Sequence, residues 1–216
     1  MRRGVDRAMP HDLFEIMRST RSMRRLKPDL VPDQLLRQVL EAGTCAANGG
    51  NMQSWRFVVI RDPAVKAAAG AWYAKAWREI AGPRYRASQP APGSTPEQFA
   101  RMLAAAEYLA DHIHEAPVWI VPCAPGPRNT GSSVFPAVQN ILLACRALGL
   151  VATLTTLHLS FATEAEAAMG LPADVHSYAI LPVGYPMGKF GPVRRVPLDS
   201  VVYQDRWGEA YIGGSS

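Results

Sequence analysis

Two polar stretches of the chain contain the residue types best suited to binding a ligand. The first, residues 18–27, combines arginine, lysine and hydroxyl side chains immediately before Pro28. Arginine forks beside a hydroxyl group can hold a phosphate through several charge-assisted hydrogen bonds. The second, residues 46–55, contains two glycines, two asparagines and one glutamine. Free backbone N–H groups and short amides suit a planar, hydrogen-bonding ligand, although each stretch alone equally fits a solvated turn or a connecting loop.

Histidines and cysteines are too scattered to predict a metal site or a nucleophile. His112 and His114 are two residues apart on an expected helix, so their side chains point to different faces. Three cysteines lie in or beside apolar runs, and their odd number argues against a disulfide framework: Cys45, Cys123 and Cys145. They are typical of small core side chains in a reducing compartment, and we expect a cytoplasmic protein.

The composition predicts one globular domain, with 48% apolar and 19% charged residues in a chain of 216. We expect this domain to span residues 11–207, with a flexible leader over residues 1–10 and a flexible tail over residues 208–216. The basic leader is not followed by an apolar segment, so a secretory signal is not expected. The longest apolar runs are too short to predict a membrane-spanning helix, and we expect no membrane partner.

A net charge of +5 raises the question of nucleic acid binding. The basic residues are scattered, apart from residues 18–27 and 189–195, and aromatic residues are not interleaved with them as single-strand binding requires. Two short basic clusters fit a smaller anion, such as a cofactor phosphate, better. We therefore expect a small-molecule ligand and no nucleic acid.

Periodicity, capping residues and proline positions predict alternating helices and strands. The expected helices span residues 12–17, 32–45, 64–80, 97–115, 131–149 and 160–169, and the expected strands span residues 55–60, 117–123, 150–157 and 178–184, with a short edge strand within 198–207. Because helices separate the strands, the pattern predicts an α+β domain without sequential hairpins. Residues 82–96 contain four prolines and predict a lid or an ordered loop.

The helix expected over residues 131–149 is apolar on nearly every side. Its apolar positions are Val134, Phe135, Val138, Ile141, Leu142, Leu143, Cys145 and Leu148. A helix of this kind must be buried on every side, which a small sheet can hardly provide alone. We therefore expect a second copy of the chain to pack against it, forming a homodimer.

Taken together, six motifs resemble the nitroreductase family of flavoproteins in order and spacing. They are T-R-S-M-R-R-L-K-P (20–28), A-A-N-G-G-N-M-Q-S-W-R-F-V-V-I (46–60), V-F-P-A-V-Q-N with L-G-L (134–150), L-T-T (154–156), P-V-G-Y-P (182–186) and R-R-V-P (194–197). The resemblance covers roughly residues 12–207. It implies an α+β sandwich of a central antiparallel sheet flanked by helices, a dimer that exchanges its C-terminal strand, and two FMN sites at the dimer interface.

On the phosphate side, the resemblance implies contacts from Arg21, Ser22 and Arg24 to the phosphate and ribityl chain, and from Arg195 as a second phosphate-side arginine. Bidentate guanidinium contacts explain why a phosphate dianion would draw arginines from both ends of the chain. Thr20 departs from the family, which usually has a further arginine there.

On the ring side, the resemblance implies that Asn51 contacts the flavin and that Asn48 reaches the flavin of the partner. It places Leu154, Thr155 and Thr156 at a strand end beside the isoalloxazine, where backbone N–H groups can tune N5. Two further departures affect the detailed geometry of the loop. The family often has Pro-Ser where Ala47-Asn48 stands, and it often has Pro where Ser54 stands.

The implied activity is that of an FMN-dependent oxidoreductase with a ping-pong mechanism. NADH or NADPH passes a hydride to flavin N5, and a small, aromatic acceptor such as a nitro compound or a quinone then takes its place. Because the cofactor carries the chemistry, no catalytic side chain is nominated. His158 follows the L-T-T motif and is either a structural histidine or a pocket residue. The chain lacks a G-x-G-x-x-G motif after a strand, so donor and acceptor are expected to share one pocket.

Three alternatives remain open. Some family members cleave reduced flavin with oxygen, and others remove halogen from an aromatic substrate under an acidic lid that bears tyrosine and lysine. Tyr73, Lys75 and Glu79 do not reproduce that lid pattern convincingly. The second alternative is a flavin- or deazaflavin-binding carrier or sensor without turnover, and the third is a basic nucleic-acid-binding module.

Overall fold

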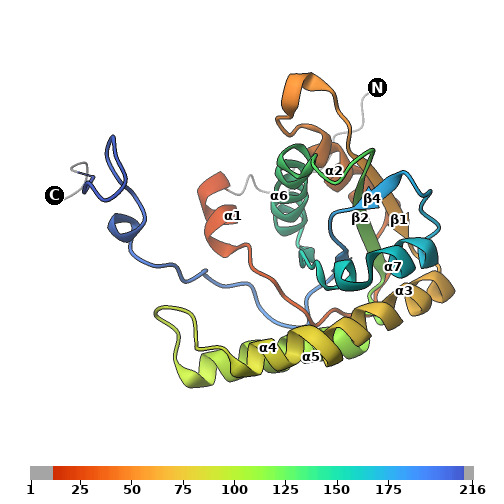
Figure 1. Cartoon of the computed structure of the whole chain (residues 1–216), viewed down its shortest axis with the longest axis horizontal. Coiled ribbons are helices and arrows are strands. Elements are labelled where there is room, and N and C mark those ends of the chain that lie inside the picture. The colour runs from red at the N-terminus through yellow and green to blue at the C-terminus, as the bar shows by residue number, and fades with distance from the viewer. Residues whose placement is uncertain (1–11, 212–216) are drawn as a thin grey trace, which may run out of the picture.

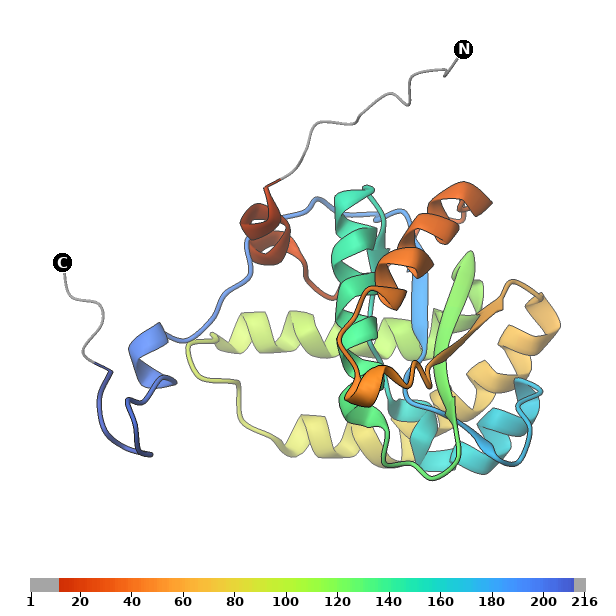
Figure 2. The same cartoon turned by 90° about the horizontal axis from the view of Figure 1, so that it is seen from above.

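The computed structural model describes residues 12–211, so the leader predicted for residues 1–10 and the end of the predicted tail lie outside the described residues. Figure 1 shows a body of sheet and helices from which the C-terminal segment projects to one side, and Figure 2 shows the same projection from above. Within residues 12–211, no helix has the length and apolar character needed to cross a membrane.

A five-stranded antiparallel sheet forms the centre of the body. Its strands are β1 (Arg56–Ile60), β2 (Val118–Pro125), β3 (Val151–Ala152), β4 (Val175–Ser177) and β5 (Leu181–Gly184). The order is β1-β2-β5-β3, and β4 pairs with β2 beyond the end of β5. β2 is buried along nearly its whole length, as its apolar sequence predicts for a central strand.

Helices cover both faces of this sheet. They are α1 (Leu13–Ser19), α2 (Asp33–Thr44), α3 (Pro63–Ala76), α4 (Gly82–Ala87), α5 (Pro96–His112), α6 (Gly131–Ala147) and α7 (Ala162–Ala168). Successive residues of β2 point to opposite faces. Val118 and Ile120 therefore join a core with α2 and α6, whereas Trp119 and Val121 join a core with α3 and α5. The predicted fold class, an α+β sandwich around an antiparallel sheet, is confirmed.

The helix predicted over residues 64–80 continues further than expected. α3 passes through a π-helical turn, Trp77–Ala81, directly into α4, so the first part of the loop predicted over residues 82–96 is helical. Pro83 lies just beyond this π-helical turn, a local widening of the helix near which a residue without a backbone N–H can be accommodated. The loop is confined to residues 88–95, and Thr95 then begins α5 through a capping box with Gln98.

Two strand predictions need correction, and one strand was not predicted. The strand expected over residues 150–157 is reduced to β3 and one further bridge between Thr155 and Ile180, because the partner strand is short. β4 was not predicted, since its three residues lie among turn-forming residues. Within the described residues, the edge strand expected in 198–207 does not join the sheet and forms one bridge, between Tyr203 and Ala210. The exchange of this segment between subunits stays a prediction.

One face of α6 is buried by the rest of the chain, whereas residues elsewhere on this helix remain partly or fully exposed. Val134, Val138 and Ile141 are fully buried, whereas Phe135 is 41% exposed. Other exposed apolar side chains lie on α1 and on the projecting C-terminal segment: Leu13, Phe14, Met17, Leu198, Val201 and Trp207. The burial predicted for every side of α6 is therefore incomplete within one chain. The homodimer that would complete it stays a prediction.

Candidate functional site

The arginine-rich stretch and the end of β3 meet through a hydrogen bond. Thr153 Oγ1 donates to the backbone carbonyl of Met23 at 3.1 Å, and Thr153 is buried directly before Leu154. The backbone N–H of Lys27 donates to the carbonyl of Tyr185 at 2.8 Å, just beyond β5. Two segments that are about 130 residues apart in sequence are thus fixed side by side at one edge of the sheet.

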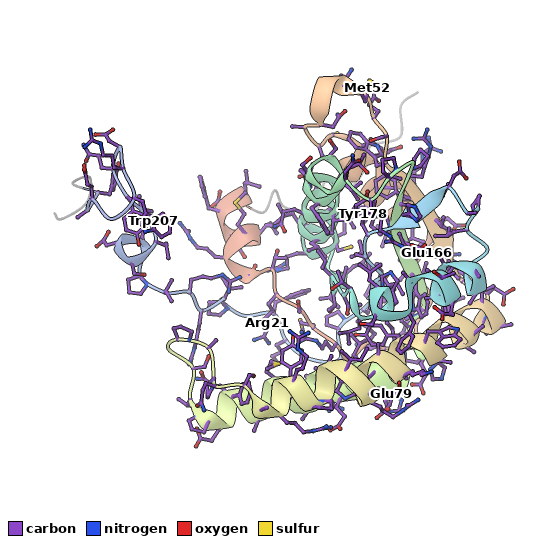
Figure 3. The ribbon with its side chains drawn as sticks, in the orientation of Figure 1. Arg21, Met52, Glu79, Glu166, Tyr178 and Trp207 are labelled. Atoms are coloured by element: carbon purple, nitrogen blue, oxygen red, sulfur yellow. The ribbon has the colours of Figure 1, made fainter. Side chains whose placement is uncertain are left out.

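Three of the predicted phosphate-side residues, Arg21, Ser22 and Arg24, line one open depression of about 530 Å³. Its opposite wall is α5, which contributes Arg101. Arg195 lines an adjoining depression of about 380 Å³, and Arg21 and Arg101 belong to both. Figure 3 shows Arg21 between α1 and α5. The structure therefore brings these four predicted residues to one place.

This depression is rich in arginine, and Glu97 of α5 interacts electrostatically with one of these residues, Arg101. Within residues 12–211, the ion pairs between arginines and carboxylates involve a different set, namely Arg37, Arg61, Arg86, Arg128 and Arg146. Arg21 Nη2 donates to the carbonyl of Lys189 at 3.0 Å, and Arg25 lies 4.0 Å over the ring of Tyr108. Guanidinium groups that lack carboxylate partners form an electrostatic site for an anion.

The predicted ring-side segment, residues 154–156, borders this region. The backbone N–H of Thr155 donates to Ile180 at 3.1 Å, and its hydroxyl oxygen lies 2.9 Å from that of Tyr73. The backbone N–H groups of Leu154 and Thr156 have no hydrogen-bond partner in the described part of the chain. The N–H groups of Leu154 and Thr156 are therefore available to a ligand, whereas the N–H group of Thr155 is not.

Tyr73 is a buried residue behind this segment, and its hydroxyl group is hydrogen-bonded to that of Thr155. Burial raises the pKa of Tyr73 to about 12, against the opposing effects of its hydrogen bond to Thr155 and the positive charge of Arg24. The phenol is therefore protonated at neutral pH and can donate to Thr155. The sequence does not indicate this pairing, because Thr155 is 82 residues away from Tyr73.

Asn48 and Asn51 lie in a different place within the same chain. The Asn48 carboxamide oxygen accepts from the backbone N–H of Gln53 at 2.9 Å, and the N–H of Gly49 donates to Ser133 Oγ at 3.2 Å, near the N-terminus of α6. Asn51 has a left-handed backbone, with φ of 54°.

The opposite end of α6 is next to the arginine stretch, since Arg146 Nε donates to Ser19 Oγ at 2.9 Å. The 13 residues from Ser133 to Arg146 span about 20 Å of helix. Figure 3 accordingly shows Met52, beside Asn51, well away from Arg21. One chain therefore does not bring Asn48 and Asn51 to its own arginines.

His158 belongs to a buried polar network and not to the depression. Its Nε2 lies 3.0 Å from Ser177 Oγ, and Glu166 Oε1 accepts from Ser177 and from Arg128 Nη2 at 2.7 Å. Burial lowers the pKa of His158 to about 4, so its ring is neutral at physiological pH. Burial opposes ionisation of Glu166, yet hydrogen bonds from Ser177 and Arg128 hold the pKa of Glu166 below its ordinary value. The network fixes the segments that follow residues 154–156.

The remaining histidines and cysteines form no metal cluster in the described part of the chain. His112 Nδ1 lies 2.9 Å from a carboxylate oxygen of Glu115. Burial raises the pKa of Cys123 and Cys145 to about 12, which makes both thiols inert core groups. Cys45 is exposed, so its prediction as a core residue is wrong.

A further pocket, of about 390 Å³, lies beside residues 82–96, the segment predicted to be a lid or an ordered loop. Its lining residues are Ala81, Arg84, Tyr85, Ser88 and Leu157. Leu157 directly follows Thr156, so this pocket continues from the predicted ring-side segment. Lys75 Nζ lies 4.8 Å over the ring of Phe161, and Figure 3 shows Glu79 on the outer side of the helices. Lys75 and Glu79 therefore do not line this pocket.

Comparisons with known proteins agree with this architecture. The model of the nitroreductase family matches residues 17–185. An NADH dehydrogenase of Thermus thermophilus is 31% identical over 206 residues, which cover 84% of this chain and 90% of that protein. Human iodotyrosine deiodinase 1 is 26% identical over 204 residues, which cover 88% of this chain and 68% of that protein.

Solved structures share the fold at lower identity. Iodotyrosine deiodinase bound to FMN and 3-iodo-L-tyrosine has a TM-score of 0.70 at 22% identity, covering 90% of this chain and 99% of that one. An FMN- and NADPH-dependent nitroreductase from Sphigopyxis sp. strain HMH has a TM-score of 0.69 at 20% identity, covering 91% of this chain and 100% of that one. With the family model matching most of its length, the chain belongs to the nitroreductase family.

Proposed function

We propose that this protein is an FMN-dependent oxidoreductase that passes a hydride from NADH or NADPH, through the flavin, to a small aromatic acceptor such as a nitro compound or a quinone. One observation carries the proposal: the hydrogen bond from Thr153 to Met23 joins an arginine-lined depression to residues 154–156. The cationic end suits a phosphate, and the other end offers free N–H groups to a planar ring.

In this proposal Arg21, Arg24 and Arg195 bind the cofactor phosphate, and Ser22 adds a hydroxyl donor. Leu154 and Thr156 present backbone N–H groups to the ring. Bound FMN would supply the redox chemistry, and the chain would bind it, orient it and shape access to it. The family relatives named NADH dehydrogenase and FMN-dependent nitroreductase support this cofactor and a nicotinamide donor.

We further propose a cytoplasmic homodimer in which each cofactor site uses both chains. Asn48 and Asn51 lie at the end of α6 remote from Arg21, so they would serve the site of the second copy. Exposed apolar side chains support such a partner, among them Phe135 on α6 and Trp207 on the projecting segment, which is 89% exposed. Exchange of that segment onto the partner would bury it.

For the acceptor we propose the pocket beside residues 82–96. Tyr85 lies against Trp77 with ring centroids 5.9 Å apart, and Leu157 forms the facing wall. Aromatic and apolar walls suit a flat ring, and Arg84 suits a polar or anionic substituent on that ring. Reductive dehalogenation, as in the deiodinase relatives, is less well supported, because Lys75 and Glu79 do not face this pocket.

The decisive experiment is the visible spectrum of the purified protein before and after anaerobic addition of NADH or NADPH. We expect flavin absorption that bleaches with at least one donor and returns when a nitroaromatic compound or a quinone is added. A bound flavin that neither donor bleaches would favour the carrier or sensor alternative. A colourless protein that fails to take up added FMN would contradict the proposal.

A further inference from the structure

Arg101 lies on the one face of α5 that borders the arginine-lined depression. The α5 residues that line the two adjoining depressions are Gln98, Arg101, Met102 and Ala105. Their spacing of three, one and three residues puts them on a single helical face. Arg101 is the charged residue on this face, and with Arg21 it is shared by both depressions.

The guanidinium of Arg101 is available for a ligand. Within residues 12–211 it forms no close ion pair or hydrogen bond. Glu97 lies one turn earlier on the same helix, and its pKa is lowered by a hydrogen bond with Thr95 and, to a smaller extent, by the charge of Arg101. By contrast, Arg86 of α4 forms an ion pair with Glu107 of α5, with Arg86 Nη2 2.9 Å from Glu107 Oε1. That ion pair joins α4 to α5, so the helix that carries Arg101 is also tied to the lid.

Thr20 stands where the family usually has an arginine, so a further cationic residue can contribute to the site. It stands at the start of the arginine-rich stretch, but its hydroxyl donates to the carbonyl of Ile16 at 2.7 Å and closes the end of α1. Its side chain therefore adds neither charge nor a free donor to the depression. A phosphate dianion held by Arg21 and Arg24 from one side has Arg101 as a cationic group on the opposite wall.

We infer that Arg101 of α5 is a further phosphate ligand of this site, and that it couples cofactor binding to the lid. The inference rests on the proposed function, because it requires that the anion in the depression be the phosphate of FMN. Since α5 is tied to α4 by the Arg86–Glu107 ion pair, a phosphate held by Arg101 would hold the α4–α5 segment against the arginine-rich stretch.

The test compares FMN with riboflavin, which lacks the phosphate. Dissociation constants for both are measured by flavin fluorescence with the full-length protein freed of cofactor, its Arg101→Gln and Arg101→Lys variants, and a matched control, Arg78→Gln. Arg78, in the π-helical turn after α3, is also exposed but lines a separate depression between α3 and the end of α5. We expect Arg101→Gln to weaken FMN binding about tenfold and to leave riboflavin binding within about twofold of wild type. Arg101→Lys should lose less, and Arg78→Gln should leave both constants unchanged.

A second measurement addresses the lid. Hydrogen exchange of residues 82–105 should slow more with FMN than with riboflavin, and Arg101→Gln should remove that difference. Unchanged FMN affinity in Arg101→Gln, or an equal loss of FMN and riboflavin, would overturn the assignment of Arg101 and leave the proposed function standing. Failure of the wild-type protein to bind FMN would overturn both.

Discussion

The hydroxyl oxygen of Tyr73 lies 2.9 Å from that of Thr155, so a buried residue of α3 meets the segment that follows β3. Because the pKa of Tyr73 is raised to about 12, the phenol keeps its proton and can donate to Thr155. The hydroxyl hydrogen of Thr155 is then free to point toward a ligand in the site. We predict that Tyr73 donates this hydrogen bond and so positions the hydroxyl group of Thr155.

The first prediction concerns this pair. Tyr73→Phe keeps the buried ring but removes the donor, so the Thr155 hydroxyl loses its orientation. We expect flavin reduction by NADH or NADPH to slow several-fold, while FMN affinity changes by less than about twofold. Stopped-flow reduction and fluorescence titration measure the two effects. An unchanged reduction rate would contradict the positioning role.

The second prediction concerns the sharing of sites between subunits. Arg24→Gln should damage the site of its own chain, and Asn48→Ala should damage the site of the partner. A heterodimer of the two variants then has one site with both defects and one intact site. Random mixing of subunits should therefore restore about a quarter of the wild-type sites. If mixing restores no activity although subunits exchange, the two residues serve the same chain.

The third prediction concerns the projecting segment. Deletion of residues 198–216 removes exposed apolar side chains such as Trp207 but retains Arg195. We expect a shift from dimer toward monomer in sedimentation and a loss of FMN affinity, because each site would lose its second chain. The substitution Trp207→Ser should give a smaller shift in the same direction. A dimer that retains wild-type affinity after the deletion would show that the segment is dispensable for assembly.

The fourth prediction concerns pH and the buried network around His158. Its folded pKa, about 4, lies below the ordinary value of 6.5, so the unfolded chain binds more protons between these values. The free energy of unfolding therefore falls as pH falls from about 6.5 to about 4, by up to about 3 kcal/mol from this group. Glu166 adds to the loss at lower pH, because its folded pKa is also depressed.

Urea denaturation at a series of pH values measures this slope. His158→Gln should be less stable at neutral pH but should show a smaller loss between pH 6.5 and 4. His112→Gln is the comparison variant, because it removes a partly exposed histidine that lies outside this buried network. Equal slopes in wild type and His158→Gln would contradict the assignment of this dependence to His158.

The sequence predicted the parts of the fold that local patterns determine. The apolar run of β2 and the capping residues of α5 predicted a central strand and a helix start within a few residues. The sequence did not predict the extent of strands that depend on pairing with a segment distant in the chain. The length of β3 depends on how far β5 extends, and β4 exists because β2 continues beyond Ile120.

The same distinction applies to the candidate site. Arg21, Ser22 and Arg24 form a compact motif, and their resemblance to a family predicted a phosphate site shared with Arg195. In the structure these residues line two adjoining depressions, and their role in binding a phosphate stays a prediction. Arg101 has no such local signal, since it is one arginine on an alanine-rich helix. Its proximity to Arg21 follows only from the way α5 packs against the sheet.

α6 sets the distance between two sets of candidate site residues in one chain, the loop of Asn48 and the arginine-rich stretch. The loop of Asn48 is bonded to its first turn, and Ser19, just before Arg21, is bonded near its last turn. If the proposed dimer is correct, each subunit holds two complementary halves that cannot reach each other. A solitary chain would then be inactive however well it folds. Activity per molecule should rise with protein concentration and reach a plateau when pairing is complete, so that cellular abundance itself sets the catalytic capacity.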